Sequence, residues 1–145
     1  MRLRVLRVPR HAPGRIVHYI PEMPAAVNPR VALAEGCRRF DAGRFFDAHE
    51  IWEDAWRVET GSRRLAMQGL IQIAAGFHKG LVQGRPAGMV RLLAAGLGKL
   101  ETSGGIGGLD LAAFRAEVTR WGDAARAWAR GGERPQLPLP RLACR

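Results

Sequence analysis

Residues 110–129 read DLAAFRAEVTRWGDAARAWA and carry the clearest helical pattern in the chain. Apolar residues recur at every third or fourth position, at Leu111, Phe114, Val118, Trp121, Ala125 and Trp128. Because an α-helix has about 3.6 residues per turn, this spacing gathers them on one face. Asp110 stands before the pattern, where its side chain can accept hydrogen bonds from the free N–H groups of a first turn. The stretch therefore predicts an amphipathic helix with one buried face.

Four more helices are predicted on the amino-terminal side of this one. Their expected ranges are about 29–40, 44–59, 63–83 and 86–101. Asn28 and Pro29 start the first, and Ser62 is the expected N-cap of the third. Gly84 and Pro86 separate the third from the fourth. No stretch alternates apolar and polar residues for long enough to indicate a sheet, so the sequence predicts an all-α bundle of about five helices.

Prolines set the two ends of the chain apart from the helices. Five prolines within residues 1–29 exclude a long helix there and predict an extended, Pro-rich N-terminal arm. Three more prolines follow Gly131 and Gly132 and predict an irregular C-terminal tail over residues 131–145, without a fixed fold. The expected organisation is an arm over 1–29, a single helical bundle domain over 30–130, and this tail.

The chain has a formal net charge of +10, and most of this charge lies in its two ends. Residues 1–29 contain five arginines and one acidic residue, and residues 130–145 contain four arginines and one acidic residue. A basic protein invites a nucleic-acid interpretation. However, neither a stripe of basic residues interleaved with aromatic ones nor a nucleic-acid motif accompanies the charge. The sequence therefore argues against specific nucleic-acid binding.

Three further features concern the location of the protein. No apolar run is long and uninterrupted enough to span a membrane, and the first residues lack the apolar core of a signal peptide. The two cysteines, Cys37 and Cys144, predict no disulfide framework. A cytoplasmic, reducing location is therefore expected.

Residues 45–56, FFDAHEIWEDAW, hold the one combination of side chains that points to chemistry. On a helix, His49 and Glu53 lie one turn apart on a face shared with large aromatic residues, whereas Glu50 falls on a solvated face. A carboxylate that points inward must be paired, protonated or bound to a cation, because an isolated buried charge is strongly unfavourable. The sequence therefore predicts a buried site between helices, built on His49 and Glu53.

Three interpretations of this pair remain open. In a structural one, Glu53 hydrogen-bonds His49 or a polar side chain of a neighbouring helix and fixes the packing. In a metal one, a nitrogen of His49 and an oxygen of Glu53 bind one divalent ion, with His78 as a third ligand. In a catalytic one, Glu53 raises the basicity of His49, and the two residues act as a metal-free acid–base pair.

The surroundings of the pair follow from the same helical geometry. The expected pocket residues are Phe46, Trp52, Trp56, Gln68 and Gln72. The two glutamines belong to the third predicted helix. If that helix packs against the second, their amide groups can hydrogen-bond His49 or Glu53.

Two segments of the sequence resemble a known family. GRFFDAHEIWEDAWR at 43–57, followed by QGLIQIAAGFHKG at 68–80, is similar to the prokaryotic domain-of-unknown-function family 309. The hallmark of that family is a His-x-x-x-Glu-x-x-Trp/Tyr motif, which His49, Glu53 and Trp56 match here. The resemblance covers roughly residues 30–100. It implies a compact helical fold and a candidate metal-binding motif, and it brings no established activity.

Two hypotheses of different class follow. In the first, His49 and Glu53 hold a divalent ion or form a polar pair in an aromatic pocket, and they support hydrolase-like chemistry on a small substrate. Glu53 is then a ligand or base, His49 a ligand or general acid–base, and Gln72 an orienting group. In the second, the chain is a non-catalytic helical interaction module, in a homodimer or with an acidic partner for its basic ends.

Overall fold

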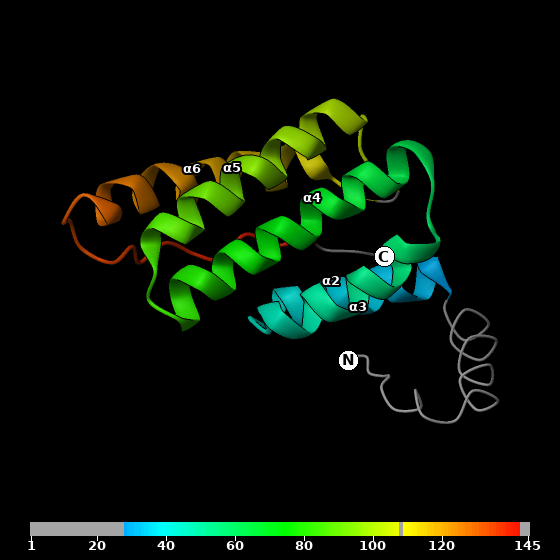
Figure 1. Ribbon diagram of the computed structural model, residues 1–145, viewed down its shortest axis with the longest axis horizontal. Helices are drawn as coiled ribbons and strands as arrows, with labels where there is room; N and C mark the ends of the chain where they lie inside the picture. The colour runs from blue at the N-terminus through cyan, green and yellow to red at the C-terminus, as the bar shows by residue number, and fades with distance from the viewer. Residues whose placement is uncertain (1–27, 108, 143–145) are drawn as a thin grey trace, which may run out of the picture.

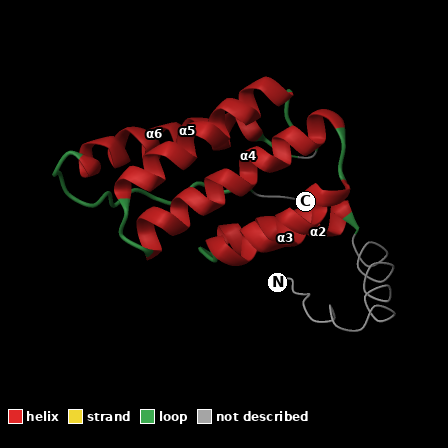
Figure 2. Cartoon of the chain, viewed as in Figure 1, coloured by secondary structure: helices red, strands yellow, loops and turns green. Residues whose placement is uncertain are grey.

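Every regular element that the computed structural model describes, within residues 28–107 and 109–142, is a helix (Figure 2). In chain order these are α2 (Pro29–Asp41), α3 (Phe45–Val58), α4 (Gly61–Phe77), the π-helical segment η2 (His78–Val82), α5 (Pro86–Ser103) and α6 (Leu111–Ala129). The predicted all-α fold with five α-helices is confirmed. Of the predicted N-terminal arm, residues 1–27 lie outside the described part of the chain.

The helices form two groups that meet along α4 (Figure 1). α2 and α3 lie side by side as a hairpin, and α3 packs against α4. On the other side, α5 packs against α4, and α6 packs against α5. α4 is therefore the central helix. The helices that carry most of the predicted site residues, α3 and α4, are direct neighbours.

Aromatic side chains from four helices close the core. The ring of Phe40 in α2 has its centroid 5.2 Å from that of Phe45 in α3 and 5.8 Å from that of Phe77 in α4. It also lies 5.6 Å from Phe114 in α6, and Phe77 lies 5.4 Å from Trp121 in the same helix. Edge-to-face pairs of this kind contribute about 0.5–1.5 kcal/mol each beyond the burial of their area. These rings join helices that are far apart in sequence.

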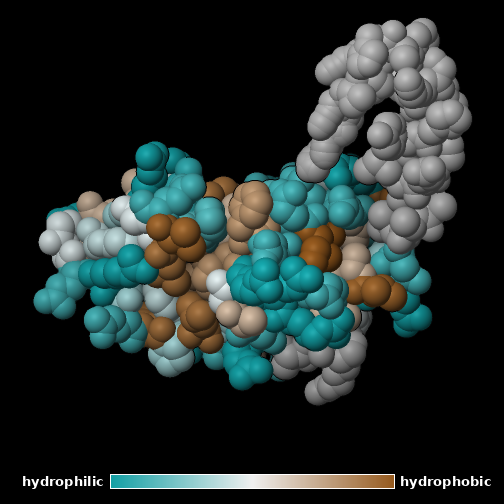
Figure 3. Space-filling model, turned by 90° about the horizontal axis from the view of Figure 1, so that it is seen from below, coloured by the Kyte–Doolittle hydropathy of each residue, from teal (hydrophilic) through white to brown (hydrophobic). Residues whose placement is uncertain are grey.

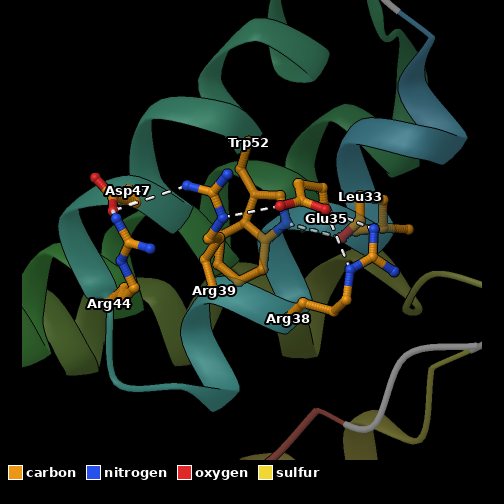
Figure 4. A network of polar contacts seen from close by, with 7 residues as sticks. All are labelled: Leu33, Glu35, Arg38, Arg39, Arg44, Asp47 and Trp52. Atoms are coloured by element: carbon orange, nitrogen blue, oxygen red, sulfur yellow. Dashed lines mark hydrogen bonds and ion pairs between the residues drawn. The ribbon is translucent and has the colours of Figure 1, made fainter.

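The α2–α3 hairpin is held together by the indole of Trp52 (Figure 4). Trp52 is fully buried, and its Nε1–H donates a hydrogen bond of 3.2 Å to the backbone oxygen of Leu33. A Cβ atom on Gly36 would overlap the indole, so the close approach of α2 and α3 requires glycine there. The hairpin thereby fixes the rotation of α3 and decides which of its side chains face outward.

The predicted third helix is corrected in two respects. It begins at Gly61, with Thr60 rather than Ser62 as its N-cap residue, because the chain turns at Gly61 with a φ of +65°. Its α-helical part ends at Phe77, and the next residues form the π-helical turn, in which the backbone N–H of Gln83 bonds the oxygen of His78 at 3.1 Å. Apolar spacing does not distinguish one π turn from one α turn, so the sequence could not reveal this change.

Residues 132–142 of the predicted tail contain neither helix nor strand but follow a fixed course. The indole N–H of Trp121 donates to the backbone oxygen of Pro138 at 2.9 Å. The backbone N–H of Leu142 donates to Asp41 Oδ1 at 2.9 Å, and the Leu142 side chain is buried. The expectation of a tail without a fixed fold is therefore wrong over these residues. Proline prevents a helix, but it leaves carbonyl groups free to accept hydrogen bonds.

The surface seen from below is mostly hydrophilic, with hydrophobic residues in separate groups (Figure 3). Across the described residues, none of the helices combines the length and the apolar character needed to cross a membrane. Cys37 is buried and disulfide-bonded, which corrects the expectation drawn from the cysteines; Cys144 lies outside the described part. Because disulfides persist mainly in oxidising compartments, the cytoplasmic location loses one of its supports and stays a prediction.

Candidate metal centre

Three side chains of α3 converge at the edge of its buried face: His49, Glu50 and Glu53. Each offers one possible ligand atom, and these atoms all lie within 4.8 Å of one another. Nδ1 of His49 lies 3.5 Å from Glu50 Oε2, and Nε2 lies 3.8 Å from Glu53 Oε2. Each nitrogen of the imidazole therefore faces a carboxylate. Both distances are too long for hydrogen bonds, so the three side chains lie near one another without being bonded.

The site is half-exposed, which corrects the prediction of a buried pair. The exposed fractions of the side chains are 22% for His49, 34% for Glu53 and 43% for Glu50. α3 turns Phe45, Ala48, Trp52 and Ala55 into the core. His49 and Glu53 consequently lie on the border between this buried face and solvent. Glu50, which was expected to be only a solvated residue, is part of the group.

The other acidic side chains of α3 are paired with arginines. Asp47 lies 2.6 Å from Arg44 and 3.8 Å from Arg39 of α2 (Figure 4). Asp54 is bonded to Arg57 at 2.9 Å. Arg57 also lies 3.5 Å from Oε1 of Glu53, which leaves Oε2 of that carboxylate facing His49. Glu50 and Glu53 are thus the acids of α3 that remain directed at the imidazole.

Three buried polar atoms in this part of the described structure have no hydrogen-bond partner. They are Nδ1 of His49, Nε1 of Trp56 and Oε1 of Gln72. Leaving a buried polar atom unsatisfied costs about 1–3 kcal/mol. Within the group, His49 Nδ1 is the atom that has this cost, and a new partner there would remove it.

Gln72 of α4 lies at the level of the group along the contact between α3 and α4. At one end of the α3–α4 contact, Phe46 lies against His78; at the other, the Arg64 guanidinium lies 3.9 Å above the Trp56 ring. Because the two helices run in opposite directions, Gln72 lies between these ends, at the level of the group. Within the described residues, neither Gln72 nor the half-buried Gln68 forms the expected hydrogen bond to His49 or Glu53.

The predicted third ligand, His78, is near the group but does not belong to it. His78 is the first residue of η2, and its ring centroid lies 5.4 Å from that of Phe46. Phe46 in turn stacks on His49, with centroids 5.9 Å apart and an angle of 14° between the rings. Glu50, not His78, is the third side chain within reach of His49 and Glu53. Trp52 belongs to the core, so we do not assign it to the wall of the site.

Residues 33–92 match the model of a family described as domain of unknown function DUF309. This segment is a DUF309 domain. It extends from α2 into α5 and contains all of α3 and α4. No curated protein matches the chain. The family resemblance noted in the sequence is confirmed, whereas the metal-binding role of its motif and its prokaryotic origin stay predictions.

The donor atoms of the DUF309 site suit a divalent cation with both nitrogen and oxygen ligands. One imidazole and two carboxylates are found at sites for Mn²⁺, Fe²⁺ or Zn²⁺. Ligand atoms on one such ion are about 3–3.5 Å apart, given metal–ligand distances of about 2.0–2.2 Å. One ion takes a single nitrogen of the imidazole, and the ligand atoms, one from each side chain, lie within 4.8 Å of one another. The largest of their separations would therefore have to shrink by up to about 2 Å. The two glutamate side chains, which are 43% and 34% exposed, are the groups that would have to rotate.

Sequence reasoning missed Glu50 and Arg57. Neighbouring residues on a helix normally point in different directions, so the wheel separated Glu50 from His49. The flat imidazole nevertheless presents a nitrogen on each side, and it can face carboxylates on two neighbouring rows of the helix. Arg57 stands one turn after Glu53, a spacing that favours an ion pair and could have been read from the sequence.

Proposed function

We propose that the DUF309 domain binds one divalent cation at His49, Glu50 and Glu53. The observation that carries this proposal is that one possible ligand atom from each of the three side chains lies within 4.8 Å of the other two. The unsatisfied Nδ1 of His49 supports it further. A cation would give each of the three groups a partner at once.

The charges around the site predict that it binds a cation with moderate affinity. Two unit negative charges at this separation repel by about 1 kcal/mol in bulk water, and partial burial increases the repulsion. Arg57 offsets part of it, but it approaches Oε1 of Glu53 and is shared with Asp54. The three ligands come from one helix and leave other coordination positions to solvent.

A cation with open positions supplies a bound water of lowered pKa for hydrolysis. The residues of this chain would contribute position and surroundings. His49 and Glu53 hold the site at the edge of the α3–α4 contact, and Gln72 offers an unsatisfied oxygen at the same level. Phe46, which is 52% exposed, provides an apolar surface next to it. This arrangement suits a small substrate, and we propose hydrolysis as the reaction class.

One observation favours the alternative of a non-catalytic interaction module. Glu53 already has a cationic neighbour, Arg57, so a row of ion pairs along α3 could satisfy the carboxylate without a metal. In that case His49 and Glu53 contribute only to the structure of the helix surface. The protein would then bind a second copy of itself or an acidic partner. The following titration separates the two functions.

The test is calorimetric titration of metal-free protein with Mn²⁺ and with Zn²⁺. We expect one site per chain in the wild type and an affinity at least tenfold lower in His49→Gln and Glu53→Gln. Asp123→Asn is a matched control, because Asp123 forms a comparable Asp–Arg pair, with Arg126 at 2.7 Å, on the remote helix α6. Circular dichroism checks that each variant is folded. Absence of binding by the wild type, or an equal loss in Asp123→Asn, would reject the cation site.

A further inference from the structure

We infer, on the basis of the proposed cation site, that Phe46 determines its metal preference by keeping the imidazole of His78 out of the coordination shell. Phe46 would then be a specificity-determining residue and not a ligand. The inference concerns which cation is favoured, and it therefore goes beyond the existence of the site.

The contacts of the phenyl ring carry the inference. The ring lies nearly parallel to His49, at 5.9 Å between centroids and 14°, and it also lies 5.4 Å from His78 at an angle of 46°. Both imidazole centroids are within 6 Å of the same phenyl centroid. They are consequently no more than about 11 Å apart. Phe46 is thus in contact with the one imidazole in the group and with a second imidazole that is not in it.

Phe46 is too exposed to contribute much to the stability of the fold. Its side chain is 52% exposed, whereas its neighbour Phe45 is 4% exposed and packs against Phe40 and Phe77. An exposed phenyl ring contributes only part of the roughly 1.5–3 kcal/mol that full burial provides. Contact with two imidazoles beside two carboxylates is therefore the main distinguishing feature of its position.

The number of imidazole ligands decides which cations a site prefers. Carboxylates suit Mg²⁺ and Mn²⁺, while each added imidazole shifts preference toward Zn²⁺, Ni²⁺ and Cu²⁺. With Phe46 in place, the group offers one nitrogen and two carboxylates. Because the ring contacts both imidazoles, its removal would leave space next to each of them. His78 would then be able to supply a second nitrogen.

The test compares Ni²⁺ and Mn²⁺ affinities of the full chain and of three variants. In Phe46→Ala we expect the ratio of the Ni²⁺ to the Mn²⁺ association constant to rise at least tenfold. In Phe46→Leu, which keeps most of the apolar volume, the ratio should stay within threefold of the wild type. In the double variant Phe46→Ala/His78→Ala the gain should disappear, because it depends on the second imidazole.

A spectroscopic count gives a second readout. Pulsed electron paramagnetic resonance of bound Cu²⁺ should detect one coordinated imidazole in the wild type and two in Phe46→Ala. If Phe46→Ala does not fold, His78→Ala in the wild-type background still tests the inference. It should leave both affinities unchanged, and a loss would show that His78 is already a ligand.

The possible failures are distinguishable. If the wild type binds no cation, the proposed function itself fails. If the wild type binds but Phe46→Ala shows an unchanged ratio, the site stands and the role of Phe46 is rejected. A gain that persists in the double variant also rejects that role, because the added ligand is then not His78.

Discussion

The backbones of Gly69 in α4 and Gly96 in α5 are in contact where the two helices cross. A Cβ atom on Gly96 would lie 2.6 Å from the backbone oxygen of Gly69, and one on Gly69 would lie 2.8 Å from the oxygen of Gly96. Neither position accepts a side chain without moving a helix. The close packing of the central helix α4 against α5 therefore requires glycine at both positions.

A pair of substitutions in α5 tests this contact. Gly96→Ala should lower the free energy of unfolding by about 1–3 kcal/mol, the usual cost of overpacking. Gly98 is exposed, and a Cβ there meets no atom of the described residues within 4 Å. Gly98→Ala should therefore raise the free energy of unfolding by about 0.5–1 kcal/mol, because alanine favours the helix. Urea denaturation measures both values, and equal effects of the two changes would contradict the close crossing.

A second pair tests the fixed course of the tail. Leu142 is 1% exposed, and Leu142→Ala should destabilise the fold by about 2–5 kcal/mol, as in other buried sites. Leu137 is 37% exposed, so Leu137→Ala should cost less than about 1 kcal/mol. Thermal denaturation of both variants provides the comparison. A loose tail would give two equally small changes.

Cation binding should raise the thermal stability of the domain. A ligand that binds only the folded state at a hundred times its Kd stabilises it by about 2.7 kcal/mol. For a chain of this size, that corresponds to a rise of roughly 5–10 °C in Tm. Differential scanning fluorimetry with Mn²⁺ and with excess chelator measures the shift. His49→Gln should show no shift, and a rise that persists in this variant would place the cation elsewhere.

The charges of α2 predict a dependence on pH. Hydrogen bonds from Arg38 and then Arg39 lower the pKa of Glu35 below its ordinary value of 4.5. A carboxyl group whose pKa is lower in the folded state stabilises the fold above the unfolded value and loses this effect as the pH falls through the folded value. The difference in stability between wild type and Glu35→Gln should therefore shrink as the pH falls from 6 to 3. Chemical denaturation across this range checks it, and a constant difference would contradict the pKa shift.

The helices could be predicted because their signals are local. Asn28 accepts hydrogen bonds from Arg30 and Val31, and Asp110 accepts one from Ala113, as the capping pattern indicated. Gly84 has a φ of +68° just after η2, where the sequence placed a helix end. These features depend on a few neighbouring residues.

The site was only partly predictable because its exposure depends on distant contacts. The sequence placed His49 and Glu53 one turn apart on one face, and the structure has them so. How far that face turns toward solvent is fixed by Trp52 against Gly36, a contact between two helices. The place of His78 depends on the turn at η2. Neither the contact between Trp52 and Gly36 nor the turn at η2 produces a periodic pattern in the sequence.

The hydrogen bond between Leu142 and Asp41 joins residues that are 101 positions apart. Asp41 ends α2, and Phe45 begins α3 shortly afterwards, so this bond ties the tail to the turn between these two helices. A substitution that removes the Asp41 carboxylate would therefore release the tail and, at the same time, loosen the turn that leads into the helix carrying His49.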